Sequence, residues 1–151
     1  MNMPRPHADP DPLRLMADQC LGFNVRKTAR LLAKAFDEAF APCGLKSTQV
    51  PILVTLHTSG QIQVRLLAEK LDLDRTTLPR NLAPLERRGL VHIEEGADRR
   101  TRMIQLTDDG RALLREALPL WHGLQDRLVA AFGQRRAEHL LVELKDLNRC
   151  L

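Results

Sequence analysis

Seven side chains suited to nucleic-acid recognition lie between residues 75 and 100. They are four arginines, two threonines and one asparagine: Arg75, Thr76, Thr77, Arg80, Asn81, Arg99 and Arg100. Arginine can pair with guanine through two hydrogen bonds and asparagine with adenine, whereas threonine hydroxyls suit phosphates or base edges. Each of these residues taken singly is equally well explained as a solvated surface group. Their joint placement predicts a surface that contacts double-stranded DNA.

The first five of these residues fall on a helix predicted over 75–88. A short helix over 64–71 precedes it, and the three residues 72–74 connect the two. Asp74 is a suitable N-cap, and Gly89 can close the helix in a left-handed conformation. Three leucines at helical spacing form its inner face: Leu78, Leu82 and Leu85. This pattern predicts a helix-turn-helix, whose second helix enters the major groove.

The hydrophobic period then changes from that of helices to that of strands. Segments 90–95 and 101–106 alternate apolar and polar residues, and a loop containing Arg99 and Arg100 joins them. A basic hairpin tip can follow a phosphate backbone or enter a minor groove. Asp98 is expected to pair with Arg100 and stiffen this tip.

Long amphipathic helices are predicted on both sides of this region. One covers 13–42, and after a helix over 47–59 and the hairpin, two more cover 108–132 and 134–149. The fold class is therefore mainly α with a small β-hairpin wing. We expect three parts, namely a proline-rich arm (1–12), a winged helix-turn-helix (46–107) and a helical dimerisation region (13–45 with 108–151). Too little apolar surface exists in one chain to cover these helices, which predicts a homodimer.

The amino-acid composition is typical of a single folded domain with a small net positive charge. The 151 residues are 44% hydrophobic, and 23 basic against 19 acidic residues give a net charge of +4. The start of the chain lacks the apolar segment of a signal peptide, and no run reaches the length of a membrane span. Three separated cysteines argue against a disulfide framework and favour a reducing cytoplasm. No contact with a membrane is expected.

Motifs of catalysis are missing from the sequence. No spacing of cysteine and histidine is typical of a metal site, and no glycine-rich phosphate loop or nucleophile elbow occurs. We therefore expect no enzyme, no catalytic residues, no metal and no cofactor.

Three segments resemble the multiple-antibiotic-resistance regulator (MarR) family. They read GLKSTQVPILVTL, LLAEKLDLDRTTLPRNLAPLERRGLV and DRRTRMIQLTDDG. The last one has the spacing of that family's wing at these positions: Asp98, Arg100, Leu106, Thr107 and Gly110. The resemblance covers about residues 13–150. It implies an obligate dimer, a palindromic operator and, usually, repression that a small molecule or an oxidant relieves.

Two prolines depart from what a DNA-reading helix normally contains. Pro79 and Pro84 both lie within the predicted helix, and each removes a backbone hydrogen bond. A bend at these positions leaves the base assignments of Arg80 and Asn81 open.

Two further residues are candidates for an effector pocket. In the resembling family, small acids bind where the reading module meets the long helices, and His57 and Trp121 could line that space. The simpler interpretation places His57 on the surface and Trp121 in the core.

Cys20 is the candidate for redox sensing. A hydroperoxide-sensing branch of the resembling family places its thiol near the start of the long helix, but activates it with tyrosine hydroxyls, and this chain has no tyrosine. The Asn24 amide could instead donate to a thiolate. A small-molecule effector is favoured over this role, and the alternative for Cys20 is a small packed side chain. Cys43 lies too far along the helix for a bridge, which leaves Cys150 of a second subunit.

Three other classes of function compete with a specific regulator. The first is an architectural DNA-binding protein of low sequence specificity. The second is a thiol enzyme that uses Cys20 or Cys43, although no histidine is near either in sequence. The third is a protein-interaction module with a wing that no longer binds DNA.

Overall fold

The computed structural model describes residues 12–74, 76–98 and 101–151. The expected arm and three of the candidate DNA contacts, Arg75, Arg99 and Arg100, lie outside these residues. The elements follow in the order α1 (Pro12–Gln19), α2 (Leu21–Phe40), the 3-10 helix η1 (Ala41–Cys43), α3 (Val50–Ser59), β1 (Ile62–Gln63), α4 (Val64–Lys70), α5 (Thr77–Arg87), β2 (Val91–Glu95), β3 (Arg102–Leu106), α6 (Asp108–Phe132) and α7 (Gln134–Arg149).

Three helices and a small sheet form a compact unit in the middle of the chain. The sheet has the order β1-β3-β2 and both pairings are antiparallel, so the predicted hairpin is confirmed. Strand β1 was not predicted, because two residues are too few to show an alternating pattern. It places Ile62 opposite Ile104 and thereby joins the segment before α4 to the wing.

The core of this unit confirms the predicted inner face of α5. The three leucines expected there are buried together with side chains of α3, α4 and the sheet: Leu78, Leu82, Leu85, Ile52, Leu53, Leu56, Leu67, Ile104 and Leu106. Burial of this many aliphatic groups stabilises the unit through removal of apolar surface from water. The outer face of α5 is thereby fixed toward solvent.

The prediction of one helix over 13–42 is wrong. Cys20 adopts an extended conformation (φ −69°, ψ 111°) that separates α1 from α2. Its Sγ accepts a hydrogen bond from the Phe23 N–H at 3.4 Å, as an N-cap does. The Asn24 amide donates to the carbonyls of Asp18 and Cys20 at 3.1 and 3.0 Å. These side chains satisfy backbone groups that a break would otherwise leave unpaired.

The helix expected from Ser47 begins three residues later, at Val50. The Ser47 N–H donates to Asp37 Oδ1 at 2.6 Å, and the Lys46 N–H donates to Gln49 Oε1 at 3.0 Å. The backbone hydrogen bond from Ser47 lowers the pKa of Asp37, which belongs to α2. The turn before α3 is therefore tied to the flanking helix.

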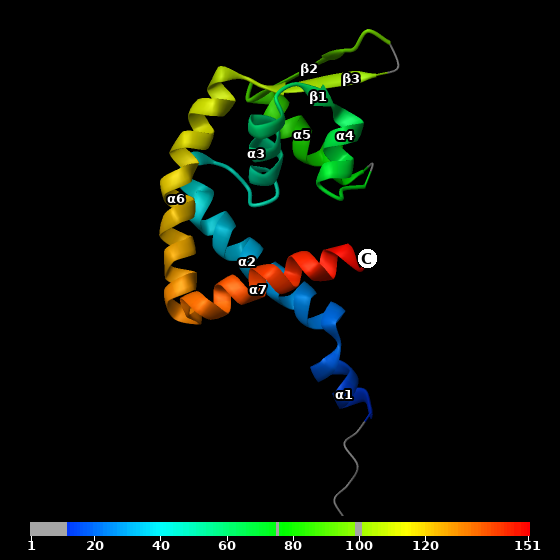
Figure 1. The fold of residues 1–151 in the computed structure, drawn as a ribbon. Coiled ribbons are helices and arrows are strands. Elements are labelled where there is room, and N and C mark those ends of the chain that lie inside the picture. The colour runs from blue at the N-terminus through cyan, green and yellow to red at the C-terminus, as the bar shows by residue number, and fades with distance from the viewer. Residues whose placement is uncertain (1–11, 75, 99–100) are drawn as a thin grey trace, which may run out of the picture.

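Helix α6 runs along one side of the molecule and links the wing to the distant end (Figure 1). It begins as predicted, with Thr107 Oγ1 accepting from the Gly110 N–H at 3.0 Å, and it continues past Pro119 without interruption. It packs against α2 and α3, and α7 turns back from its far end. Among the described residues, no helix combines the length and apolar character that crossing a membrane requires.

Candidate nucleic-acid interface

Asp74 organises the start of α5. Its carboxylate accepts hydrogen bonds from the Thr76 and Thr77 hydroxyls at 2.7 and 2.8 Å and from both their N–H groups at 2.7 Å. The hydroxyls, followed by the N–H groups, hold the pKa of this carboxyl well below its ordinary value. Asp74 therefore satisfies N–H groups at the start of the helix as expected, but α5 begins at Thr77 with Thr76 in the N-cap position, two residues later than the sequence predicted. Both threonine protons point to Asp74, which leaves the hydroxyl oxygens as acceptors.

Asn81 connects α5 to the turn before α3. Its Oδ1 accepts from the Thr48 hydroxyl at 2.7 Å, and its Nδ2 donates to the Thr77 carbonyl at 3.0 Å. The side chain is half-buried, whereas Arg80 beside it is exposed. Of the two candidates for base contact in this turn, Arg80 therefore has the freer approach to a ligand.

Neither Pro79 nor Pro84 ends α5. Pro84 lies inside α5, and Pro79 lies in its first turn, where few N–H groups have a helical partner. Leu82 and Leu85 on either side of Pro84 remain buried, so the helix keeps its contact with the core.

The wing is closed by backbone hydrogen bonds near its tip. The Gly96 N–H donates to the Thr101 carbonyl at 2.9 Å, and the Thr101 N–H donates to the Asp98 carbonyl at 2.7 Å. Asp98 is exposed. Its expected pairing with Arg100 involves a residue outside the described part of the chain.

Arg88 makes a connection that sequence reasoning missed. Its guanidinium donates to the carbonyls of Gly44 and Cys43 at 2.7 and 3.1 Å, across more than forty residues of sequence. Cys43 is the last residue of η1 and Gly44 follows it, and the planar guanidinium can donate to both carbonyls at the same time. The end of α5 is therefore anchored to the end of the flanking helix.

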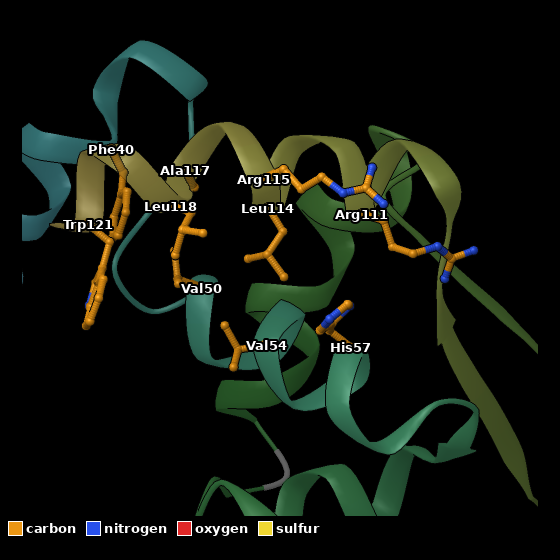
Figure 2. Close-up of a pocket in the computed structure, with 10 residues that line it drawn as sticks. All are labelled: Phe40, Val50, Val54, His57, Arg111, Leu114, Arg115, Ala117, Leu118 and Trp121. Carbon is orange, nitrogen blue, oxygen red and sulfur yellow. The ribbon is translucent and has the colours of Figure 1, made fainter.

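A cavity of about 520 Å³ lies between α3 and α6 (Figure 2). It is lined by Phe40, Val50, Val54, His57, Arg111, Leu114, Arg115, Ala117, Leu118 and Trp121. The structure thus brings both pocket candidates of the sequence to the same cavity. Figure 2 shows Phe40 and Trp121 toward one end and the two arginines with His57 toward the other. Arg111 is held by the Leu106 carbonyl at 2.8 Å and by Asp108 at 2.7 Å.

The cysteines are widely separated. Cys20 and Cys43 lie at opposite ends of α2, whose twenty residues span roughly 30 Å. Cys43 Sγ donates to the Phe40 carbonyl at 3.1 Å. The Asn24 amide, expected to face the Cys20 sulfur, bonds backbone carbonyls instead.

The fold and this surface define a winged helix-turn-helix protein. Comparisons with known proteins identify the family to which it is similar. The model of the MarR family matches residues 44–101. The M. tuberculosis transcriptional regulator MosR, solved with DNA, is 37% identical, with a TM-score of 0.74 over 87% of this chain and 98% of that one. The transcriptional repressor CouR, bound to a 23-mer DNA duplex, is 27% identical with a TM-score of 0.81, over 88% and 95% of the two chains.

A relative from Bacillus subtilis, the HTH-type transcriptional regulator YwoH, agrees with these matches. It is 29% identical over 114 residues, which are 76% of this chain and 83% of that protein. The chain belongs to the MarR family and is a DNA-binding transcriptional regulator. These relatives are regulators rather than enzymes.

Proposed function

We propose that the protein is a homodimeric repressor that leaves a palindromic operator when a small molecule fills the cavity between α3 and α6. The cavity itself is the observation that carries this proposal. One wall belongs to the DNA-reading unit and the other to a long flanking helix. A ligand placed there touches both and can favour one arrangement of the two over another.

The reading surface is assigned to the outer face of α5 and the wing. Arg80 is the principal base-reading candidate because it is exposed on that face. Thr77 and Asn81 are assigned to the same face, and Thr76 and Arg75 precede the helix in sequence. Arg99 and Arg100 are assigned to the wing tip from the sequence alone.

Dimer formation follows from apolar side chains that the single chain leaves in water. On α1 and α2 these are Leu13, Met16, Leu21, Phe23, Val25 and Leu31, and on α7 they are Leu140, Leu141 and Val142. Helix α7, all of which the structure describes, has no buried residue. A twofold pairing of residues 13–45 and 108–151 covers these faces, with 46–107 as the reading unit. Light scattering that gives a monomer mass at micromolar concentration contradicts this part.

The cavity favours an effector with an apolar body and one anionic group. Aliphatic and aromatic walls suit a planar hydrocarbon ring, and Arg115 with His57 offers donors at one end. The relative CouR, 27% identical, has been solved with p-coumaroyl-CoA. An aromatic carboxylic acid or its thioester therefore heads the set of compounds to test.

Two hydrogen-bonded links extend from the cavity to α5. Val50 in the cavity wall follows Thr48, which bonds Asn81 of α5, and Phe40 precedes η1, whose end Arg88 holds. A ligand that separates α3 from α6 would shift these links and turn the reading helix. The two reading helices of a dimer fit the two half-sites of an operator only at one spacing. A small rotation of each helix is therefore enough to release the operator.

The test begins with selection of genomic fragments that the purified protein binds, which yields the operator. Release of the operator by p-coumarate and related aromatic acids is then followed in wild type and in Val54→Trp. The indole should fill the cavity and abolish release while DNA binding persists. Thr58→Trp, on the same helix but outside the lining, is the control and should release normally. Equal release in both variants contradicts the assignment of the cavity.

An oxidant-sensing repressor is the second candidate. One observation favours it: the Cys20 side chain lies at the start of α2, where its sulfur accepts a hydrogen bond from the Phe23 N–H.

A further inference from the structure

A second concave surface, of about 470 Å³, lies between α4, α5 and the start of β3, at the end of the wing nearer its tip. Gln63 and Arg65 line it from the start of α4, Pro79 lines it from α5, and Thr101 with Arg102 lines it from the wing. Arg80, the one arginine among the described residues that was discussed above as a base contact, is not part of its lining. Its basic side chains therefore need a separate explanation.

Strand pairing explains why two arginines distant in sequence meet here. Gln63 pairs with Met103 in the β1–β3 ladder, so the start of α4 lies next to the start of β3. Side chains alternate along a strand, which puts Arg102 on the same face as the buried Ile104 and Leu106. Arg102 lies beyond the edge of the core, however, and it is exposed. The Arg102 side chain is thus on the face of the sheet that packs against the helices, but it remains exposed to solvent.

The charges of this surface favour an anion at the arginine end. Arg65 Nε is 3.3 Å from Glu69 Oε1, but the side chains are 80% and 55% exposed, and such a pair is weak. The other carboxylate in the lining, Asp74, already accepts four hydrogen bonds from Thr76 and Thr77. The guanidinium groups of Arg65 and Arg102 therefore remain available to a phosphate.

The phosphate groups of a DNA strand are the anions that this surface would meet. A single sugar–phosphate strand separates a major groove from the minor groove beside it. A protein that places α5 in the major groove and the wing over the adjacent minor groove must hold that strand between them. The concave surface occupies this position, since α5 forms one of its sides and β3 another.

We propose that Arg65 and Arg102, assisted by the Gln63 amide, bind phosphates of the DNA strand that passes between α5 and the wing. This proposal rests on the placement of α5 in the major groove given above. Phosphate contacts carry no base information, so the surface fixes the position of the reading helix rather than the sequence it reads. Arg65 and Arg102 are thus positioning residues for Arg80.

The test measures binding of the full chain to operator and to scrambled DNA by fluorescence anisotropy over a salt series. Arg65→Gln and Arg102→Gln should each weaken both complexes by about fivefold to tenfold at 0.1 M salt and lower the salt slope by about one. Glu69→Gln frees Arg65 and should tighten both complexes. Arg127→Gln, at the far end of α6, removes the same charge and should change neither. Thermal melting and dimer mass of each variant show whether the fold is kept.

The outcomes separate this inference from the function on which it rests. The phosphate surface is wrong if Arg65→Gln, Arg102→Gln and Glu69→Gln all keep wild-type affinity and salt slope. If Arg80→Gln loses preference for the operator in the same experiment, the assignment of α5 as the reading helix stands. If the wild-type protein does not distinguish operator from scrambled DNA, the proposed function fails. A loss confined to the operator in Arg65→Gln also overturns the inference, since it indicates base readout.

Discussion

The Thr48 hydroxyl donates a 2.7 Å hydrogen bond to Asn81 Oδ1 and so joins the turn before α3 to the reading helix. Asn81 also holds the Thr77 carbonyl through its Nδ2. A side chain predicted to read adenine is therefore also part of the link between the cavity wall and α5. Whether its structural or its reading role dominates can be measured.

Thr48→Val and Asn81→Ala form a matched pair for that measurement. Both remove the bond between the two side chains, and Asn81→Ala also removes the bond from Nδ2 to the Thr77 carbonyl. Thr48→Val should lower stability by about 0.5–1 kcal/mol, a modest amount because the lost bond is exposed, and Asn81→Ala should lower it further. If Asn81 also reads a base, only Asn81→Ala should relax preference at particular base pairs, at a cost of about 1–3 kcal/mol. Equal operator affinities in the two variants would assign Asn81 a purely structural role.

Arg88→Ala should weaken the coupling between the cavity and α5. The variant loses both hydrogen bonds to η1, and we expect a stability loss of about 1 kcal/mol. The effector concentration needed for half-release of the operator should rise several-fold, because one of the two links is gone. Arg87→Ala, an exposed neighbour, is the control in both assays. An unchanged effector response in Arg88→Ala would mean that this link transmits nothing.

Gly110→Ala should be strongly destabilising. A β-carbon there would lie 2.1 Å from the Leu90 carbonyl oxygen and 2.7 Å from Leu106 Cδ1, which forces α6 away from the sheet. We expect a loss of about 3 kcal/mol in unfolding free energy. Gly123→Ala on the same helix meets nothing within 4 Å and should instead gain about 0.5–1 kcal/mol. Denaturant unfolding of the two variants gives the comparison, and similar midpoints would contradict it.

Protonation of Asp74 should weaken the start of α5. Because the folded protein lowers the pKa of this carboxyl, its contribution to stability is present above the ordinary value of 3.8 and is lost as the pH falls below that value. Asp74→Ala lacks the contribution at pH 7 and should therefore approach wild type as the pH is lowered. Thermal midpoints measured from pH 7 downward test this, and a constant difference between the two proteins would contradict it.

Local patterns in the sequence predicted much of this fold. Local signals of this kind are the spacing of Leu78, Leu82 and Leu85, the cap Thr107 and the alternation of the hairpin. Each depends on neighbours within a few residues and can be read directly. The presence of His57 and Trp121 at one cavity followed from the resemblance to the MarR family.

Features that depend on distant partners could not be read in the same way. The break at Cys20 is a local exception: Asn24 reaches back to the carbonyls of Asp18 in α1 and of Cys20 at the break, and helical periodicity does not encode such a contact. The hold of Arg88 on η1 spans more than forty residues. Strand β1 exists only because β3 lies beside it. Arg88 and strand β1 find their partners only after the chain has folded.

Organic hydroperoxide should release the operator no faster from wild type than from Cys20→Ser, if a non-covalent effector controls this protein. The Asn24 amide does not reach the sulfur, and the chain has no tyrosine to activate it. An intact α2 keeps Cys20 roughly 30 Å from Cys43, far beyond the Cα separation of about 7 Å that a disulfide allows. Any cross-link would therefore join two subunits, with Cys150 as the partner for Cys20. Release that depends on Cys20, together with a dimer-sized band on a non-reducing gel that Cys150→Ser abolishes, would replace the small-molecule switch with an oxidant sensor.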